Sequence, residues 1–435
     1  MKGITRRAFL RDAAAVSVAA GTIRTAAGAE ASTSANDRIV AAVIGTGGRG
    51  QGTFISDLVR RKDVAVAAVC DVDEGRLGKA AEMVYSATGK KPTGAGDFRR
   101  VLDDRSIDVV FVATTHHWHS PIAVPAVLAG KDVYVEKPAS HVFREGRVLV
   151  DAARKHKRIV QHGTQMRSSE VTAKAGEILA SGLLGEIKMS KAWNVQRHSH
   201  RQAVGDAPEP AGVNYDMWLG PAPKRAFNPN RFHGSWNWYR DYGNGDIGND
   251  GVHDLDMARW GLGVKTHPVR ITAHGSRIDL AGEREYPDNM MVAYHYGEGK
   301  VLLYEDRGWT PYGMFGFDSG NAFYGTKGQM IFSRRGYFQV YFGQNEEKGP
   351  GMRGGGGLPD HLTNFLDCVR TRRQPIADAE VAHLSCGLVH LGEIAYRAGR
   401  VLEFDPQSET VKNDPEANRM LTKEYRSPWE LPAPV

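Results

Sequence analysis

The stretch Arg38–Gly52, "RIVAAVIGTGGRGQG", decides the fold of this chain. Its run Ile39–Ile44 is apolar and rich in β-branched residues, which favours a parallel strand buried on both faces. The run ends in a G-x-G-x-x-G motif, Gly45-Thr46-Gly47-Gly48-Arg49-Gly50, and "GTFISDLVRR" continues with the periodicity of an amphipathic helix. Glycines here let the backbone approach a pyrophosphate, whose charge the helix N-terminus favours. The stretch therefore predicts a dinucleotide-binding strand, turn and helix.

An acid follows the second predicted strand. The run "VAVAAVCDVD" reaches Asp71, which lies 21 residues after Gly50. A carboxylate at this distance accepts hydrogen bonds from the adenosine ribose and repels a 2′-phosphate. NAD is therefore favoured as the cofactor, and NADP is the less favoured alternative because Arg49 and Arg76 could soften the repulsion.

Strand-like and helix-like segments alternate from Arg38 to Gln165, which predicts a doubly wound parallel sheet over residues 38–165. Ligands of such sheets bind beyond the carboxyl ends of the strands. The residues expected there, besides the glycine motif and Asp71, are Thr114, Thr115, His116, His119, Glu136, Lys137 and Gln165. They form the predicted edge of the cofactor cleft.

The charged pair Glu136–Lys137 ends the buried run "DVYV", and Pro138 follows it. Packing alone does not place an acid and a base at a buried strand end, so we interpret the pair as facing the cofactor. Pro138 restricts Lys137 to an extended conformation. The nearby histidines 116, 117, 119 and 141 raise the alternative of a metal site, but no acidic residue has a suitable spacing. We therefore predict no metal.

The second half changes character. Five strand-like runs, "VRITAHGSRI", "NMMVAYHY", "KVLLYEDRG", "NAFYGTKGQMIFS" and "GYFQVYFG", are split by Gly, Asp and Asn, which predicts a meander of antiparallel strands. Two helices are predicted at "DHLTNFLDCVRTR" and "AEVAHLSCGLVHLGEIAYRAG". The predicted class is thus an α/β parallel-sheet domain followed by an α+β domain, and 435 residues suit two domains.

The first 29 residues have the features of an export signal. Arg6 and Arg7 precede a short Ala-rich apolar run, and a small-residue cut after Ala29 fits. We expect a twin-arginine signal peptide, recognised by the twin-arginine export machinery, and a periplasmic or secreted protein. A disordered basic tail and an uncleaved anchor are alternatives. Most of the formal net charge of +6 lies in this leader, so the sequence gives no case for nucleic acid. Cys70, Cys368 and Cys386 form neither a metal spacing nor a disulfide framework.

Three segments carry a resemblance to a known family. "IGTGGRG", "ATTHHWHSPIAVPAVLAGKDVYVEKP" and "GNGDIGNDGVHDLDMARW" together resemble the Gfo/Idh/MocA oxidoreductases, the glucose–fructose oxidoreductase and inositol dehydrogenase family. The resemblance implies a second domain with a large, open, mainly antiparallel sheet, here residues 166–405, with a C-terminal arm over 406–435. It also implies a homo-oligomer, a dimer or a tetramer.

The resemblance also implies the catalytic residues. The family's general base corresponds to His253, and Lys137 comes from the Glu-Lys-Pro motif. Many members have Asp four residues before the histidine, where this chain has Asn249 followed by Asp250. Either Asp250 substitutes for that acid, or Asn249 only orients the substrate. We expect His253 to take the substrate hydroxyl proton, with a pKa near neutrality, while Lys137 stabilises the alkoxide or is itself the base.

Aromatic and basic residues around these motifs are the substrate candidates. Aromatic faces stack on sugar rings, and arginine binds hydroxyls or carboxylates with two hydrogen bonds. With His253, the candidates are Arg167, Trp193, Trp238, Tyr239 and Arg240, followed by His198 and Trp236. Core packing of each tryptophan is an equal alternative.

The leading hypothesis is an exported NAD-dependent oxidoreductase that acts on a carbohydrate or polyol hydroxyl with a tightly held cofactor. A redox-neutral glycosidase or epimerase that recycles its cofactor is the second hypothesis. The exported NAD-dependent glycosidases of the family carry a tyrosine in the histidine motif, and "GNDGVHDLD" has none. A sugar-binding protein with a vestigial cofactor site is the third.

Overall fold

The computed structural model describes residues 38–432, except 197, 199–201 and 279–282. The expected signal peptide lies outside these residues, so its prediction remains one. The described part belongs to one compact unit, Arg38–Val435. Within it, no helix has the length and apolarity needed to span a membrane.

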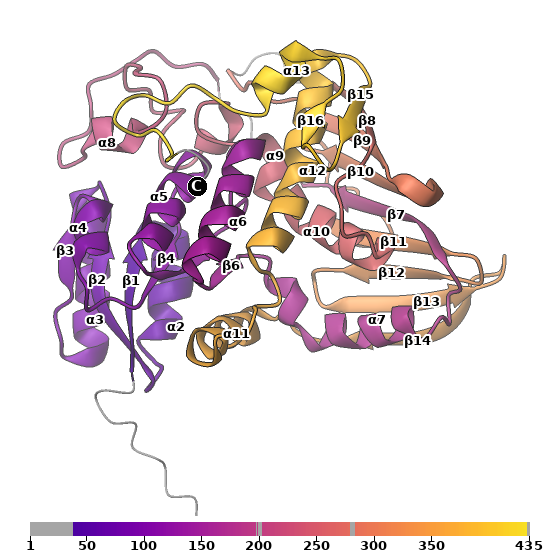
Figure 1. Ribbon diagram of the computed structural model, residues 1–435, viewed down its shortest axis with the longest axis horizontal. Coiled ribbons are helices and arrows are strands. Elements are labelled where there is room, and N and C mark those ends of the chain that lie inside the picture. Colours follow the sequence, from indigo (N-terminus) through magenta and orange to yellow (C-terminus); the bar gives the residue numbers. More distant parts are fainter. Residues whose placement is uncertain (1–37, 197, 199–201, 279–282, 433–435) are drawn as a thin grey trace, which may run out of the picture. The chain divides into compact units, whose positions relative to one another are not determined.

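A six-stranded sheet forms the first half, in the order β3-β2-β1-β4-β5-β6 (Figure 1). All its strand pairs are parallel, which confirms the predicted doubly wound sheet. The strands are β1 (Ile39–Ile44), β2 (Val64–Cys70), β3 (Thr93–Ala95), β4 (Val109–Val112), β5 (Asp132–Val135) and β6 (Val160–His162). The chain order reverses between β1 and β4, and ligands of such folds bind at this switch point.

Helices cover both faces of this sheet. On one face lie α4 (Phe98–Asp103), α5 (His116–Leu128) and α6 (Phe143–His156). On the other lie the π-helical turn η2 (Gly50–Ile55), α2 (Ser56–Leu58), α3 (Glu74–Thr88) and a late helix, α11 (Leu358–Thr371). The helix predicted after the glycine motif thus begins with i→i+5 geometry and is short.

The position of α11 shows that the domains are not continuous segments of chain. Leu362 and Phe365 of α11 share a core cluster with Val43, Phe111 and Tyr134 of the first sheet. A helix that the sequence analysis placed in the segment 166–405 therefore completes the first domain. Apolar side chains on the uncovered sheet face need a partner, and the chain supplies it from far along the sequence.

The second half is built on a ten-stranded, mainly antiparallel sheet, as the resemblance implied. In spatial order its strands are β14 (Glu347–Arg353), β13 (Tyr337–Phe342), β12 (Gln329–Ser333), β11 (Ser319–Gly325), β7 (Ile187–Asn194), β10 (Val301–Arg307), β9 (Asn289–His295), β8 (Arg270–Ser276), β15 (Leu402–Asp405) and β16 (Thr410–Val411). Only β7 and β10 pair in parallel. The predicted run "NAFYGTKGQMIFS" proves to be two strands, β11 and β12, joined by a turn. The edge strand β14 carries Gly and Pro and had no strand pattern.

Helices pack on one face of this sheet. α10 (Gly251–Leu262) lies on β7 and β11, α12 (Ala379–Ala398) on β8, and α7 (Glu170–Ala180) on β13. α12 also packs against α6, so it joins the two sheets (Figure 1). α10 begins at Gly251, as predicted, and this places the histidine motif against the first domain.

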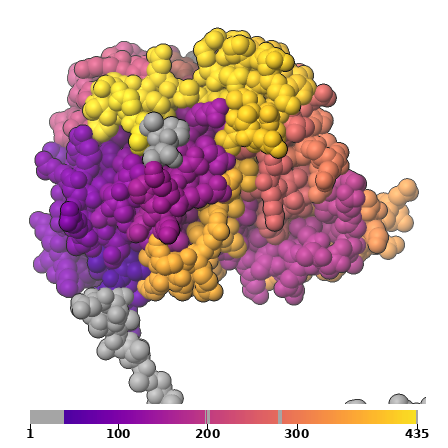
Figure 2. Space-filling view, in the orientation of Figure 1, coloured from indigo at the N-terminus to yellow at the C-terminus, as the bar shows by residue number. Residues whose placement is uncertain are grey.

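The C-terminal segment returns to the first domain. After α13 (Pro415–Met420) the chain runs over α5, where Trp429 packs against Trp118 with ring centroids 5.0 Å apart. Arg426 donates to the carbonyl of Gly220. Figure 2 shows this yellow segment lying on the violet surface of the first half.

Candidate active site

The glycine motif forms a turn that only small residues fit. Gly45 has φ +88°, and a Cβ there would lie 2.5 Å from the carbonyl oxygen of Ala113. A Cβ on Gly50 would lie 2.1 Å from the carbonyl oxygen of Gly45. The helix therefore starts directly against the strand end. This is the close approach that a pyrophosphate-binding turn requires.

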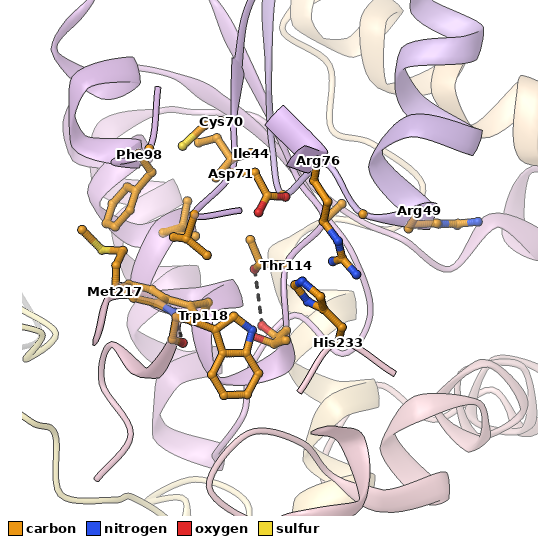
Figure 3. A pocket seen from close by; sticks show the side chains of 18 of the residues that line it. Ile44, Arg49, Cys70, Asp71, Arg76, Phe98, Thr114, Trp118, Met217 and His233 are labelled. Carbon is orange, nitrogen blue, oxygen red and sulfur yellow. Dashed lines mark hydrogen bonds between the residues drawn. The ribbon is translucent and has the colours of Figure 1, made fainter. Parts of the chain in front are cut away.

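Asp71 holds the turn from the neighbouring strand. Its carboxylate accepts hydrogen bonds from the Thr46 amide at 2.7 Å and the Thr46 hydroxyl at 3.1 Å. It lines a cleft of about 270 Å³ with Gly45, Gly47, Gly48 and Arg49. In Figure 3, Asp71, Arg76 and His233 lie on one side of this cleft, and Phe98, Met217 and Trp118 on the other. The polar side suits a ribose and the apolar side suits a flat base.

A segment of the second domain roofs the cleft. The Glu74 amide donates to the Gly212 carbonyl at 2.9 Å, and the Asn214 amide donates to the Val72 carbonyl at 2.9 Å. His233 Nε2 lies 2.8 Å from Asp73 Oδ2. The roof residues that line the cleft are Met217, Trp218, His233 and Trp236. Apart from Trp236, sequence reasoning missed them, because no motif links this loop to the glycine turn.

A second cavity, of about 370 Å³, adjoins the cleft. The two share Arg49, Ala113, Thr114 and Trp236 in their linings. The second cavity is also lined by the predicted residues His116, His119, Glu136, Lys137, Gln165, Asn249, Asp250 and His253, and by Arg334. The structure thus brings the Glu-Lys-Pro motif and the histidine motif together, although more than a hundred residues separate them in the sequence.

Lys137 points from the end of β5 towards the histidine motif. Its Nζ donates to the main-chain oxygen of Asn249 and lies 3.5 Å from the Asn249 side-chain oxygen. The peptide bond to Pro138 is cis. Burial lowers the pKa of Lys137, and the negative charge of Asp250 opposes part of that effect.

Asp250 and Arg334 form an ion pair in the wall of the cavity, with Arg334 Nη2 donating to Asp250 Oδ1 at 3.1 Å. Arg334 Nε donates to the hydroxyl of Ser319. Burial alone would raise the pKa of Asp250, but Lys137 and Arg334 lower it below its ordinary value. Asp250 is therefore the acid that pairs with Arg334 and acts on Lys137 through its charge, while Asn249 contacts Lys137 mainly through its backbone.

His253, in the first turn of α10, is buried at the cavity wall. Burial lowers its pKa well below the ordinary value, and the charges of Arg334 and Lys137 lower it further. The expectation of a pKa near neutrality is therefore wrong for this structure. A neutral imidazole is present at physiological pH.

The remaining predicted cofactor residues hold the cavity wall. Glu136 accepts from Arg49 at 2.7 Å, and Gln165 Nε2 lies 3.5 Å from Glu136. His119 Nδ1 lies 2.6 Å from the carbonyl oxygen of Pro138. Thr115 lines the cleft, and His116 lies beside Trp236 with ring centroids 4.6 Å apart.

Six substrate candidates are not among the described residues that line the cleft or the second cavity. One of them is His198, whose Nε2 lies 2.9 Å from Asp246 Oδ2. Arg167 is buried in a bidentate pair with Asp256 at 2.7 and 2.8 Å. Trp193 lies in β7 of the second sheet, where its side chain is fully buried and its Nε1 donates to the Phe317 carbonyl. The others are Trp238 and Tyr239, in an aromatic cluster of the roof segment, and Arg240, beside Tyr286. Core packing explains the tryptophans, and the substrate role of all six stays a prediction without a contact to support it.

Arg334 is the cavity residue that sequence reasoning missed. It follows β12 in the segment "SRRG", where nothing distinguishes it from its exposed neighbour Arg335. Only the pairing of β12 with β11 directs its guanidinium towards α10.

The fold and the cleft are those of a Rossmann-type dinucleotide-binding protein. The second cavity beside the cleft is lined by ionisable side chains. The family model described as "Oxidoreductase family, NAD-binding Rossmann fold" matches residues 39–164. The model of that family's "C-terminal alpha/beta domain" matches residues 174–317 and 356–431. The chain therefore belongs to the Gfo/Idh/MocA oxidoreductase family, and its first domain is an NAD-binding domain.

Curated relatives match parts of the chain. A glycosyl hydrolase family 109 protein of Stenotrophomonas maltophilia is 34% identical over 151 residues, which is 33% of this chain and 32% of that protein. Inositol 2-dehydrogenase 2 of Saccharopolyspora erythraea is 28% identical over 239 residues, 54% of this chain and 57% of that protein. The chain thus spans about a third of the length of the first relative and just over half of the second.

Solved structures share the whole fold. The aldose-aldose oxidoreductase of Caulobacter crescentus, complexed with glycerol, has a TM-score of 0.65 at 18% identity and covers 84% of this chain and 100% of its own. A levoglucosan dehydrogenase in complex with NADH and L-sorbose has a TM-score of 0.65 at 18% identity, with 84% and 99% covered. At this identity the likeness concerns the fold.

Proposed function

We propose that this chain is an NAD-dependent oxidoreductase that oxidises a CH–OH group of a carbohydrate or polyol. The observation that carries the proposal is the convergence of Lys137, Asp250, His253 and Arg334 in a cavity that shares its wall with the nucleotide cleft. Enzymes of this class need a proton acceptor and a group that stabilises an oxyanion beside the cofactor.

The cleft fits the cofactor. The positions of Gly45 and Gly50 have no room for a Cβ, so the backbone itself is free to face a pyrophosphate. Asp71 and the apolar side near Phe98 and Trp118 would hold the ribose and the base. When bound, NAD supplies the hydride acceptor.

The residues of the cavity then have separate roles in the reaction of the substrate. Neutral His253 accepts the hydroxyl proton, and it is already in its base form at neutral pH. Lys137 donates a hydrogen bond to the oxygen that becomes negative. Asp250, held by Arg334, opposes the loss of the Lys137 proton. Trp236, shared by both cavities, closes the site from the side of the roof.

The cofactor is retained between turnovers in this proposal. The roof segment crosses the cleft through two main-chain hydrogen bonds and the His233–Asp73 contact, so exchange of the nucleotide requires the roof to open. Retention suits a protein exported to a compartment without free NAD, as the leader predicts. Asp71 favours NAD over NADP, because a 2′-phosphate would meet its carboxylate.

The experiment mixes the full chain with a panel of aldoses, polyols, glycosides and uronates, with and without added NAD. The near-ultraviolet absorbance of NADH and the products are followed together. We expect NADH with one substrate class, and His253→Ala to lower the rate by about 10²–10⁴-fold. No product and no NADH from any member of the panel would refute the proposal.

A redox-neutral reaction is the second candidate. It is supported by the glycosyl hydrolase family 109 relatives, which match about a third of the chain, and by the roofed cleft. Its signature is product formation with at most one equivalent of NADH per chain. Continuous NADH production would exclude it.

A further inference from the structure

Three buried side chains converge outside the nucleotide cleft. His267 precedes β8, His383 lies in α12, and Glu409 lies in the turn between β15 and β16. His383 Nε2 lies 2.9 Å from Glu409 Oε1, His267 Nε2 lies 3.3 Å from His383 Nε2, and His267 Nε2 lies 3.6 Å from Glu409 Oε1. None of the three lines the cleft or the cavity of the active site.

The triangle of donor atoms has the size of a metal site. A point equidistant from three atoms at these separations lies about 1.9 Å from each, and Zn²⁺ binds histidine nitrogen and carboxylate oxygen at about 2.0–2.2 Å. An ion slightly out of the plane of the three atoms would therefore meet all of them without any side chain moving. Two imidazoles and one carboxylate are also a donor set that Zn²⁺ prefers.

Hydrogen bonding does not account for the arrangement as well. His383 Nε2 can donate its proton to Glu409 Oε1 at 2.9 Å. His267 Nε2 lies 3.6 Å from the same oxygen, which is too long for a hydrogen bond. If both rings carry a proton on Nε2, neither Nε2 can accept a hydrogen bond from the other across the 3.3 Å that separates them. Both Nδ1 atoms are buried without a hydrogen-bond partner among the described residues. Ligation through Nε2 places the ring proton on Nδ1, so each of these protons would be buried without a partner, which is a cost of the site.

The surroundings hold the three donors in place. The Phe143 ring lies 4.9 Å from each imidazole. Positions 146 and 387 must be glycine, because a Cβ there would lie 2.5 Å from a ring atom of His383 or His267. Glu409 adopts φ +52°, a conformation that residues with a side chain rarely take, in order to present its carboxylate.

Charge around the cluster permits a cation. Arg147 donates to Glu409 at 2.6 Å and so orients the carboxylate. The same guanidinium lies 3.5 Å from Glu380 and 3.8 Å from Asp151. The three carboxylates outnumber Arg147 and Arg154, which pairs with Glu380 at 2.7 Å. A divalent ion would be partly neutralised by this excess of negative charge.

We propose that His267, His383 and Glu409 form a structural site for one divalent transition-metal ion of the Zn²⁺ type. The ion joins the β15–β16 turn and the loop before β8 to α12, next to α6 of the first domain. Its fourth ligand is water. The site is independent of the proposed oxidoreductase activity.

The test uses the full chain without a histidine tag. The protein is stripped with a chelator, loaded with Zn²⁺, dialysed and measured for metal content, and Co²⁺ absorption is recorded in parallel. We expect about one equivalent of Zn²⁺, a visible Co²⁺ spectrum and a higher melting temperature for the loaded protein. His267→Asn and Glu409→Gln should each lose the bound ion.

The matched control is His390→Asn. His390 is a buried histidine of the same helix as His383, and its Nε2 lies 3.1 Å from the Ser140 hydroxyl, outside the triangle. This variant should bind Zn²⁺ as the wild type does. A Zn²⁺ content below about a tenth of an equivalent per chain in the loaded wild type would overturn the site. Equal Zn²⁺ binding by the wild type and the triad variants would also overturn it, because the metal would then belong to the active-site histidines. If one of the two triad variants does not fold, the other decides.

Discussion

At the scale of single residues, the position of His253 sets its chemistry. Burial, Arg334 and Lys137 all act in the same direction on its pKa. Burial and Arg334 also lower the pKa of Lys137, but the charge of Asp250 opposes this lowering. His253 is therefore a neutral imidazole at neutral pH, while the charge of Asp250 favours the ammonium form of Lys137.

The pH profile tests this assignment. Activity should rise with pH through the lowered pKa of His253, below 6.5, and fall through the lowered pKa of Lys137, below 10.5. Arg334→Met removes a positive charge from both groups, so each pKa rises and both limbs move to higher pH, by about one unit. The pH dependence of kcat/KM, measured from acid to alkaline pH for the wild type and the variant, tests the shift of both limbs.

The control for this experiment is Arg335→Met, because Arg335 pairs with Asp318 at the surface. Its profile should match the wild type. Limbs that stay in place in Arg334→Met, or move to lower pH, would contradict the electrostatic role of Arg334.

Asp71 carries the prediction on cofactor choice. In Asp71→Ala, a ribose loses a charged hydrogen-bond acceptor worth about 1.5–3 kcal/mol, and a 2′-phosphate loses a repulsion. The ratio of NADP to NAD affinity should rise at least about tenfold, measured by equilibrium titration of both nucleotides. An unchanged ratio of the two affinities would mean that Asp71 only supports the glycine turn, through the two hydrogen bonds that it accepts from Thr46.

At the scale of elements, the contact of η2 with β1 is the feature that places the nucleotide. Gly50→Ala would force a Cβ to 2.1 Å from the Gly45 carbonyl, so the helix start must shift. We expect a loss of about 1–3 kcal/mol in the free energy of unfolding and weaker NAD binding. Gly52→Ala, in the same turn, meets nothing within 4 Å and should leave both unchanged. Denaturant titration with nucleotide binding compares the pair, and equal stability of the two variants would contradict the contact.

At the scale of the whole molecule, chain segments distant in sequence complete each domain. The C-terminal segment packs Trp429 on Trp118 of α5, and Arg99 lies over the Trp429 ring at 4.9 Å. Trp429→Ala should lower the free energy of unfolding by about 2 kcal/mol, because the ring is partly buried. Trp309→Ala, with Trp309 45% exposed, is the control and should change stability little. Denaturant unfolding of both variants measures this, and a neutral Trp429→Ala would show that the segment docks without stabilising α5.

Local features of the chain could be predicted from the sequence, and features that depend on long-range packing could not. The glycine motif, Asp71 and the strand-end residues are local signals, and their elements were predicted within a few residues. Arg167 and Trp193 belong to residue types that are common to sugar sites and cores alike, and both are buried outside the two cavities. Arg334 carried no local signal, since its role depends on the partner strand of β12. The three donors of the proposed metal site lie more than a hundred and twenty residues apart from first to last.

The sequence by itself determined the parallel sheet, the glycine turn, the family and the two motifs of the candidate active site, because each depends on periodicity or on residues adjacent in the chain. The tertiary structure alone decided that α11 completes the first domain, that the segment from Gly212 to Trp236 roofs the nucleotide cleft and that His253 is neutral. These depend on burial and on charges brought together by long-range packing. Such effects act through space, and spacing along the chain does not encode them.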